Sequence, residues 1–435
     1  MNAKASLEKI VSLCKRRGFV FPSAEIYGGI NGIYDFGPLG VALRQNLKNA
    51  WIKNLTSGKE DVVLMEGSLL GPEGVWKASG HVDNFSDPMV DCLNCKKRYR
   101  SDEIDLHKVC PSCGIKKWTE PRQFNMMFKT ELGAMAENSS IAYLRPETAQ
   151  AIFINFKNVM TSSRVKIPFG IAQIGKAFRN EITPKQFLFR MREFEQMEMQ
   201  FFCQEKDASD FFEFWVNKRR SFYDSIGFKS ENIKFRDHNS DELAHYAKAA
   251  KDIEYEFPFG WKEMEGIHNR SNFDLTQHTR FSGKELSVFD EELKSSYIPF
   301  VIECSVGLDR LFFATLCDCF EEDAVENETR TILKFHPRIA PVKAAVLPLS
   351  KKLTEGAEKV YNNLKILGYN VQFDNAGSIG KLYRRQDEIG TPVCFTYDFD
   401  SGVDNCVTAR DRDTLKQERI SIDKVADYLG EILKK

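Results

Sequence analysis

Four cysteines form two Cys-x-x-Cys pairs, Cys92 with Cys95 and Cys110 with Cys113, in a segment rich in Lys, Arg and Asp. Each pair can bind one face of a tetrahedral metal ion, and the 14 residues between the pairs are enough to bring them together. Four thiolates favour a structural zinc, because they leave no open coordination position. Four unrelated buried cysteines are the alternative. The spacing predicts a zinc-binding insertion over residues 91–118.

A second group of residues has the chemistry to bind a polyphosphate. The strings Phe178-Arg-Asn-Glu181 and Arg192-Glu-Phe-Glu195 flank a loop, and residues 164–192 contain seven Lys or Arg but a single acid. Arginine can bind phosphate oxygens in pairs, and a ring such as Phe194 can stack on a base. A charged hairpin that only faces solvent is the alternative.

The third candidate is the string Glu303-Cys-Ser-Val-Gly-Leu-Asp-Arg310, where an apolar strand meets an apolar helix. A glycine and an arginine at such a junction can approach a phosphate closely, and Glu303 has the chemistry to bind a magnesium ion or a substrate ammonium. A simple ion pair is the alternative. Among the seven scattered His, His81 and His268 are interpreted as hydrogen-bonded core or rim residues rather than ligands.

These groups belong to a chain of 435 residues, 42% hydrophobic and 28% charged, which is typical of a soluble protein with two or three domains. Its 61 basic residues balance 62 acidic ones, which excludes a histone-like nucleic-acid binder but allows local basic surfaces. The chain has no run of roughly 18 apolar residues and no apolar signal core. We therefore expect a cytoplasmic protein without a membrane partner, with its cysteines reduced.

The hydrophobic pattern predicts the elements that position these residues. From about residue 342, strands alternate with helices, the βαβ signature of a small mixed-sheet domain. We therefore expect a catalytic domain over residues 1–338, with a mostly helical insertion at about 205–250, and an α/β domain over residues 339–435. The other expected helices cover residues 7–17, 41–55, 148–160, 207–226 and 308–319, and the expected strands cover residues 141–146, 169–179, 193–202, 252–259 and 299–307.

Taken in order, these segments resemble the three signature motifs of class II aminoacyl-tRNA synthetases, most closely the homodimeric glycyl type of class IIa. Gly37-Pro-Leu-Gly-Val and the following helix resemble motif 1, the dimer-interface element. The two strings around the basic loop resemble motif 2, and Gly307-Leu-Asp-Arg resembles motif 3. Four further strings resemble the glycyl type: Ser79-Gly-His-Val, Asp87-Pro-Met-Val-Asp-Cys, Arg145-Pro-Glu-Thr-Ala-Gln and Thr396-Tyr-Asp-Phe-Asp.

The resemblance implies an α+β fold, in which an antiparallel-sheet catalytic domain carries the zinc-type insertion and precedes a C-terminal mixed α/β anticodon-binding domain. It implies an ATP-dependent glycine–tRNA ligase, a homodimer that uses Mg²⁺ and binds glycine, ATP and glycine tRNA. Two alternatives stay open: a synthetase for another small amino acid (threonine, serine or proline), and a catalytically silent tRNA-binding or polymerase accessory protein. The acid-rich pocket argues against the first, and the presence of Arg179, Arg192 and Arg310 against the second.

The resemblance also assigns roles to single residues. Arg179 and Arg310 would hold the α- and γ-phosphates of ATP, and Glu303 joins them as the third catalytic residue. Phe194 would stack on adenine, and Glu181 would meet its amino group. The other residues assigned to ATP are Asn180, Phe189, Arg192, Glu263, Met264, Gly307 and Asp309, of which Glu263 and Met264 match a magnesium-associated site.

For glycine, the resemblance assigns Glu147, Glu198, Glu303 and Ser305 to the ammonium group. The other residues assigned to this substrate are Arg100, Phe194, Arg270 and Gly307. Three residues depart from the usual pattern, Ala151, Cys304 and Val306 in place of Gly, Pro and Ala, and they change packing rather than charge.

The C-terminal segment offers no obvious RNA-binding face, because residues 341–435 contain 15 basic and 14 acidic residues. The cluster Lys381, Arg384 and Arg385 and the stretch 410–412 are the best candidates. A solvated helix face is the alternative.

Overall fold

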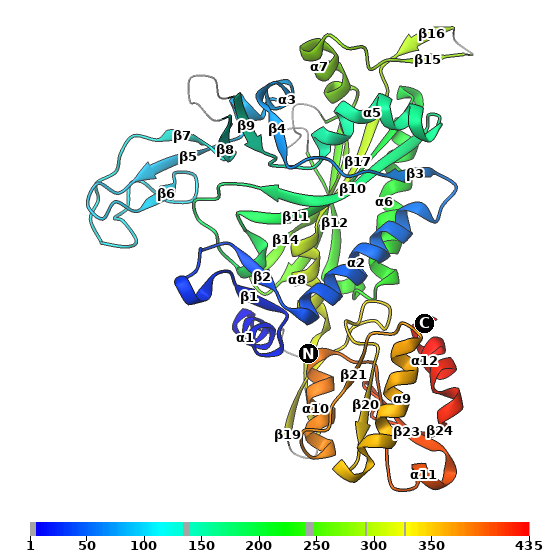
Figure 1. Ribbon diagram of the computed structural model, residues 1–435. Helices are drawn as coiled ribbons and strands as arrows, with labels where there is room; N and C mark the ends of the chain where they lie inside the picture. Colours follow the sequence, from blue (N-terminus) through cyan, green and yellow to red (C-terminus); the bar gives the residue numbers. More distant parts are fainter. Residues whose placement is uncertain (1–5, 134–139, 240–246, 292–293, 326–327, 435) are drawn as a thin grey trace.

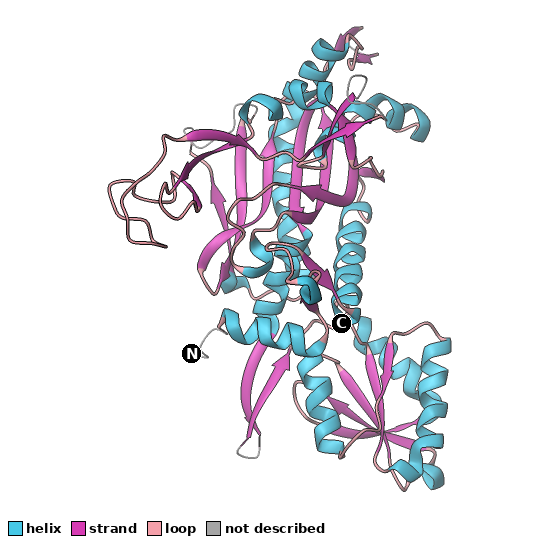
Figure 2. Ribbon diagram, turned by 60° about the vertical axis from the view of Figure 1, so that its left-hand side comes forward, coloured by secondary structure: helices cyan, strands magenta, loops and turns pink. Residues whose placement is uncertain are grey.

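The computed structural model of the chain describes residues 6–133, 140–239, 247–291, 294–325 and 328–434. Figure 1 shows a large body built around one sheet and, below it, a smaller unit that holds the C-terminus. The view in Figure 2 separates the strands of the two sheets and shows helices packed against both. The first helix, α1 (Leu7–Arg17), lies where the two units meet, and its Arg17 forms an ion pair with Glu388 of the smaller unit.

The large sheet has seven strands in the order β12-β13-β14-β17-β11-β10-β3. Every neighbouring pair is antiparallel except β10 and β3, which are parallel. The strands are β3 (Asp61–Leu64), β10 (Phe169–Phe178), β11 (Glu193–Cys203), β12 (Ile233–Asp237), β13 (Ala249–Phe257), β14 (Gly260–Asn269) and β17 (Phe300–Gly307).

The central strands have one apolar and one polar face, because successive side chains of a strand point to opposite sides. In β11, Met197, Met199 and Phe201 pack into the main core. Glu198 and Gln200 alternate with them, and Gln200 donates a hydrogen bond to Glu303 of the neighbouring β17. The polar face of β11 and β17 is therefore available for a binding site.

Helices cover the two faces of the sheet unequally. Buried residues of α2, α6 and α8 join the main core, whereas α5 and α7 form a second core with the other face of β10, β11 and β17. In α2, Leu43, Leu47 and Trp51 are buried at intervals of four, the spacing of one helix face. These helices are α2 (Pro38–Thr56), α5 (Ala149–Ser163), α6 (Ala208–Ser225), α7 (Phe273–Ser282) and α8 (Leu308–Cys319), with the short α3 (Glu73–Ala78) and α4 (His81–Asn84) beside them.

Smaller sheets surround this body. The sheet β6-β5-β7 carries the cysteine-rich segment and projects sideways in Figure 1. The remaining strands are β1 (Val20–Pro22) with β2 (Tyr34–Phe36), β4 (Leu70–Pro72) with β9 (Ser140–Leu144) and β8 (Lys129–Leu132), β6 (Arg98–Arg100) with β5 (Ser86–Asp91) and β7 (Arg122–Asn125), β15 (Val288–Asp290) with β16 (Ser295–Tyr297), and β18 (Phe320–Val325) with β19 (Glu328–Leu333).

The smaller unit has its own core and a five-stranded sheet in the order β21-β20-β22-β23-β24. The first three strands are parallel and the last two pairings antiparallel. With the antiparallel large sheet, this arrangement confirms the predicted α+β fold and C-terminal α/β unit. Its elements are β20 (Ala344–Pro348), α9 (Thr354–Ile366), β21 (Val371–Phe373), α10 (Ile379–Ile389), β22 (Val393–Tyr397), α11 (Ser401–Asp404), β23 (Cys406–Asp411), β24 (Gln417–Ser421) and α12 (Val425–Lys434).

Two regions differ from the sequence-based picture. Residues 205–250 contain the helix α6, but its Phe212 and Trp215 belong to the main core and the later strand β12 joins the large sheet. This segment is therefore built into the sheet rather than being a mostly helical insertion, and residues 240–246 lie outside the described part. The strand β14 was not predicted, because its charged string Trp261-Lys-Glu-Met-Glu lacks apolar alternation. The boundary between residues 338 and 339 stays a prediction.

Candidate active site

A cavity of about 390 Å³ opens on the polar face of the large sheet, over β11, β14 and β17. Of the side chains assigned to ATP or glycine, only Asn180 and Arg192 are not among its described lining residues. The assigned residues that line it are Arg100, Glu147, Arg179, Glu181, Phe189, Phe194, Glu198, Glu263, Met264, Arg270, Glu303, Ser305, Gly307, Asp309 and Arg310.

One end of the cavity is rich in carboxylates. Glu303, in β17, has three partners: it accepts hydrogen bonds from Gln200 Nε2 at 2.8 Å, from Arg270 Nη1 at 3.2 Å, and lies 2.8 Å from His268 Nδ1. Arg270 is itself anchored, since its Nε donates to Asp274 at 2.8 Å. Glu303 is thus a fully partnered carboxylate, with the Arg270 guanidinium and the His268 ring against it.

Glu147, two residues before α5, also belongs to this end. Its Oε2 is 3.3 Å from His81 Nε2, and its Oε1 accepts a hydrogen bond from Gln150 at 2.8 Å. The other ring nitrogen of His81 lies 2.8 Å from the Ser79 hydroxyl. Both histidines that the sequence suggested as hydrogen-bonded residues therefore orient a glutamate of the cavity.

Glu198, in β11, is the least neutralised of the three glutamates. Its Oε1 accepts a hydrogen bond from the Ser305 hydroxyl at 3.1 Å, and its Oε2 is buried without a hydrogen-bond partner among the described residues. Burial, reinforced by the charges of Glu303 and Glu147, raises the pKa of Glu198 to about 8. Glu198 is therefore largely protonated at neutral pH.

The other two glutamates shift in the opposite direction. Burial raises the pKa of Glu303, but the charge of Arg270 and the contact with His268 outweigh it and lower the pKa to about 2. Burial likewise opposes ionisation of Glu147, yet His81 holds its pKa well below the ordinary value. This end of the cavity thus combines two carboxylates with one neutral acid.

The other end of the cavity holds arginines against aromatic rings. The Arg179 guanidinium lies 5.2 Å from the ring centre of Phe85 and 5.3 Å from that of Phe194. Its Nε donates to the Pro146 carbonyl at 3.1 Å, and no carboxylate of the described residues lies within 4.0 Å of it. The charge of Arg179 is therefore available to an anion.

Arg310, at the start of α8, is placed similarly. Its guanidinium lies 4.4 Å from the Phe189 ring centre and donates to the carbonyls of Phe189 and Glu263 at 3.4 and 3.2 Å. The half-exposed Glu263 carboxylate is 3.5 Å away. Glu181 also lines the cavity, and burial raises its pKa against the opposing charges of Arg190 and Arg179.

Asn180 and Arg192 support the loop between β10 and β11 instead of lining the cavity. The Arg192 side chain donates to the carbonyls of Glu181 and Asn31 at 2.8 and 2.7 Å. The backbone N–H of Asn180 donates to the Met126 carbonyl at 2.7 Å. Both residues therefore fix the backbone on which Arg179 and Glu181 stand.

The cysteine-rich segment contributes Arg100 to the cavity. Arg100 forms an ion pair with Asp87 at 2.9 Å, which fixes β6 against β5. Glu103 then binds Lys185 and Arg190 of the loop between β10 and β11, each at 2.8 Å. These contacts join the insertion to the cavity wall.

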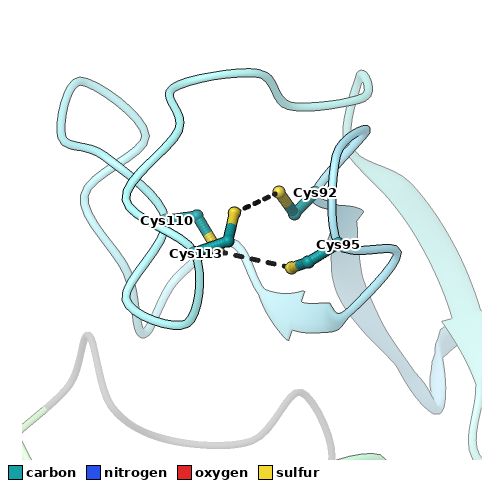
Figure 3. A group of neighbouring side chains, drawn as sticks. All are labelled: Cys92, Cys95, Cys110 and Cys113. Carbon is teal, nitrogen blue, oxygen red and sulfur yellow. Dashed lines mark hydrogen bonds between the residues drawn. The ribbon is translucent and has the colours of Figure 1, made fainter.

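The four cysteines of this segment converge as the spacing predicts (Figure 3). Their sulfur atoms all lie within 4.8 Å of one another, with 3.6 Å between Cys92 and Cys113 and 3.7 Å between Cys95 and Cys110. A tetrahedral zinc with Zn–S bonds of about 2.3 Å needs sulfurs about 3.8 Å apart. The donor set therefore fits zinc.

The suggestion that the stretch 410–412 binds RNA is wrong for its two arginines. Arg410 and Arg412 are only 7% and 3% exposed, so they cannot present their charges to a tRNA. Arg410 binds Asp387 at 2.9 and 3.1 Å, and Arg412 binds the Gly390 carbonyl at 2.9 Å. The neighbouring Lys381 is exposed and stays a candidate.

Sequence reasoning did not assign His268, Gln196, Arg190 and Met126 to the cavity. A signal for His268 existed in β14, where a glycine stands two residues earlier on the same face. A Cβ on Gly266 would lie 2.5 Å from the His268 ring, so the glycine makes room for the histidine that orients Glu303.

Comparisons with known proteins agree with this geometry. Residues 128–318 match the family described as tRNA synthetase class II core domain (G, H, P, S and T), and residues 343–432 match the Anticodon binding domain. The chain is 52% identical to the glycine–tRNA ligase of Treponema denticola over 96% of this chain and 95% of that protein. The chain belongs to the glycine–tRNA ligase family. The resemblance seen in the motifs is confirmed.

Two more members of the glycine–tRNA ligase family are similar over nearly their whole length. The protein of Caldanaerobacter subterraneus subsp. tengcongensis is 50% identical over 100% of both chains. That of Borrelia hermsii is 52% identical over 97% of this chain and 96% of its own length.

Among the described residues, no helix has both the length and the apolar character needed to cross a membrane.

The three departures from the family pattern leave the charges of the cavity unchanged. Cys304 and Val306 are fully buried in the main core, on the face of β17 opposite to Glu303 and Ser305. Ala151 lies in α5, where its methyl group packs close to Gly67. All three residues therefore act through packing, as the sequence indicates.

Proposed function

We propose that the cavity activates glycine with ATP, and that the chain then transfers the glycyl group to the 3′ end of glycine tRNA. The observation that carries this proposal is the division of one cavity into a carboxylate-rich end and an end with arginines over aromatic rings. The first end suits an ammonium group, and the second suits a nucleotide. A silent binding protein would need neither charge arrangement.

At the carboxylate end, Glu147, Glu198 and Ser305 would accept hydrogen bonds from the glycine ammonium. Glu303 already has three partners, so its main part would be to hold His268 and Arg270 in place while adding negative charge. A substrate without a side chain offers only its ammonium and carboxylate as handles. The surplus of acceptors around one point therefore favours glycine over a larger amino acid, which this packed end would exclude.

At the arginine end, Arg179 and Arg310 would hold the phosphates, with the adenine on Phe194. The glycine carboxylate then attacks the α-phosphorus, the bond to pyrophosphate breaks, and the leaving group carries away the negative charge. The reaction needs alignment and charge stabilisation rather than an acid–base residue. Glu263, half-exposed beside Arg310, is the carboxylate placed to hold Mg²⁺, which would neutralise phosphate charge when bound.

For the insertion we propose one structural zinc on Cys92, Cys95, Cys110 and Cys113. It would order the segment that carries Arg100 to the cavity. Cys110→Ser should reduce the zinc content of freshly reduced protein and expose residues 91–118 to proteolysis. Wild-type protein without bound zinc would contradict this assignment.

We also propose that the catalytic unit spans residues 1–338 and the anticodon-binding unit residues 339–435, in a cytoplasmic homodimer. The match of residues 343–432 to the Anticodon binding domain supports a tRNA contact there. Support for the dimer comes from exposed apolar side chains in and before the region that resembles motif 1: Val41 of α2 lies in it, and Ile26 and Tyr27, which precede it, are 88% and 87% exposed. Sedimentation of the purified chain measures its oligomeric state.

The test of the whole function is aminoacylation. Purified protein, ATP, Mg²⁺ and labelled glycine should charge a glycine tRNA transcript, and should leave an alanine tRNA transcript uncharged. Charging with threonine, serine or proline instead would assign another substrate. Tight tRNA binding without charging would identify a catalytically silent protein.

A further inference from the structure

Arg44, on α2, is buried behind the cavity and is not among its described lining residues. Its guanidinium lies 3.9 Å from the Phe36 ring centre, donates from Nη2 to Glu195 at 2.7 Å, and donates from Nη1 to Asp309. Lys48, one turn further along α2, donates to the other oxygen of Glu195 at 2.6 Å. One helix therefore presents two cations to carboxylates from two other elements.

These two carboxylates stand next to the residues that would hold ATP. Glu195 follows Phe194 in β11, and Asp309 precedes Arg310 at the start of α8. The two segments also touch directly, because the backbone N–H of Glu195 donates to Asp309 Oδ2 at 2.7 Å. Arg44 thus closes a ring of contacts behind Phe194 and Arg310.

We propose that Arg44 is a positioning residue for ATP, which fixes the Phe194 segment relative to the Arg310 segment. The inference rests on the proposed function in one respect, the assignment of this end of the cavity to ATP. A guanidinium suits the task because its planar fork can serve two carboxylates in a fixed geometry, whereas an ammonium is a point charge on a flexible stem. Asp309, assigned to ATP from the motif, acts here through Arg44 and Glu195.

The position of Arg44 is set by the core rather than by the site. On the same helix, Leu43, Leu47 and Trp51 are fully buried, and the Phe36 ring lies under the guanidinium. Through Arg44, the helix therefore holds both ATP-binding segments in a fixed position relative to the core. Because misplacement of a reacting group by about 1 Å can cost roughly 10²-fold in rate, loss of the Arg44 contacts should lower the rate of catalysis measurably.

The test compares Arg44→Lys and Arg44→Gln with wild type in glycine-dependent ATP–pyrophosphate exchange, with ATP and glycine titrated separately. Both variants should raise the KM for ATP and lower kcat, so that kcat/KM for ATP falls by about 10²-fold. The KM for glycine should change little. If Arg44 only neutralises buried carboxylates, Arg44→Lys will restore wild-type kinetics, and that result would overturn the proposal.

Lys48→Met provides a milder variant in case Arg44→Gln does not fold. Glu195 keeps its contact with Arg44, so a smaller rise in the KM for ATP is expected, and an unchanged KM would count against the proposal. Arg330→Lys is the matched control. Arg330 is also a buried arginine that binds two carboxylates, Asp323 and Asp387, but it lies at the junction of the two units and not at the cavity. This control should lower Tm and leave the KM for ATP unchanged.

The experiment also distinguishes a failure of the proposed function from a failure of the role proposed for Arg44. Absence of exchange in the wild-type protein would contradict the proposed function. Wild-type exchange together with an unaltered KM for ATP in Arg44→Lys would contradict only the role of Arg44.

Discussion

The cavity and the junction between the two units both concentrate arginines, but they use them differently. At the cavity, Arg179 lies between aromatic rings and donates to a backbone carbonyl. At the junction, Arg330 and Arg410 both bind Asp387, and both are almost completely buried. Since the residue type is the same, its partners decide whether the charge is available to a ligand.

This difference has a physical basis. An aromatic face orients a guanidinium through a modest attraction and leaves its N–H groups pointing outward. A buried carboxylate neutralises the guanidinium and makes it part of the fold. The cavity arginines are therefore expected to affect catalysis, and the junction arginines stability.

The largest effect is expected for Arg179→Ala. Loss of a charge-assisted contact that is strongest in the transition state should lower glycine-dependent exchange by about 10²–10³-fold or more. Binding of tRNA, measured by filter retention, should stay nearly unchanged. Arg280→Ala, an exposed arginine of α7, is the control. Near-normal exchange in Arg179→Ala would show that the arginine does not bind the phosphate.

Arg410→Met should have the converse result. Asp387 would lose one of its two buried cations, so we expect the free energy of unfolding to fall by about 3 kcal/mol while exchange stays normal. Urea unfolding measures the change. Arg419→Met, which breaks more exposed ion pairs with Asp398 and Asp404, should cost at most about 1 kcal/mol. Equal losses in the two variants would contradict the distinction between buried and exposed ion pairs.

The carboxylates of the cavity extend the comparison, because a glutamate too can be catalytic or structural. Glu147→Gln should raise the KM for glycine by about tenfold or more and change the KM for ATP little, since a charge-assisted hydrogen bond contributes about 1.5–3 kcal/mol. Ser305→Ala should have a smaller effect, and alanine should remain a very poor substrate of both variants. If Glu147 only supports α5, the change will lower Tm and leave the KM for glycine unchanged.

The last prediction is a pH dependence of glycine binding. The pKa of Glu198 is raised to about 8, so below that pH the free site must release a proton before Glu198 can pair with an ammonium. The affinity for glycine should therefore rise as pH increases from about 6 to 8, by up to roughly tenfold per unit, and level off above pH 8. The charges that face Glu198 are those of Glu147, Glu303, Arg270 and Arg145, and His268 acts through Glu303.

Calorimetry in two buffers of different ionisation enthalpy can measure this proton release directly. In Glu198→Gln the affinity should be lower and the dependence between pH 6 and 8 reduced. An affinity of the wild-type protein that is constant over this range would contradict a protonated Glu198.

The sequence predicted most elements from local patterns, whereas most residues of the cavity were assigned through the resemblance to the family. The helix over residues 7–17 and the strands on both sides of the basic loop agree with α1, β10 and β11. The strand β14 could not be predicted, since its charged residues gain their partners through tertiary contacts with elements such as α6, α8 and β17. Glu265, for example, is buried in β14 by pairing with Arg219 of α6 at 2.6 Å.

The distinction between available and neutralised arginines also lay beyond the sequence. In the sequence, the basic residues of the stretch 410–412 suggested RNA binding in the same way that those of the loop between β10 and β11 suggested phosphate binding. The partner of Arg410, Asp387, lies 23 residues earlier on another element, and only tertiary contacts show that it neutralises this arginine. For the same reason Arg44, which lies 151 residues from Glu195, could not be connected with the arginine end of the cavity.

The central claim, that the divided cavity activates glycine, is tested most directly by amino-acid-dependent ATP–pyrophosphate exchange with the purified wild-type chain. Glycine, alanine, serine, threonine and proline would be compared at equal concentration. Exchange should be rapid with glycine and very slow with the other four. Exchange that is equally fast with a larger amino acid, or absent with all five, would contradict it.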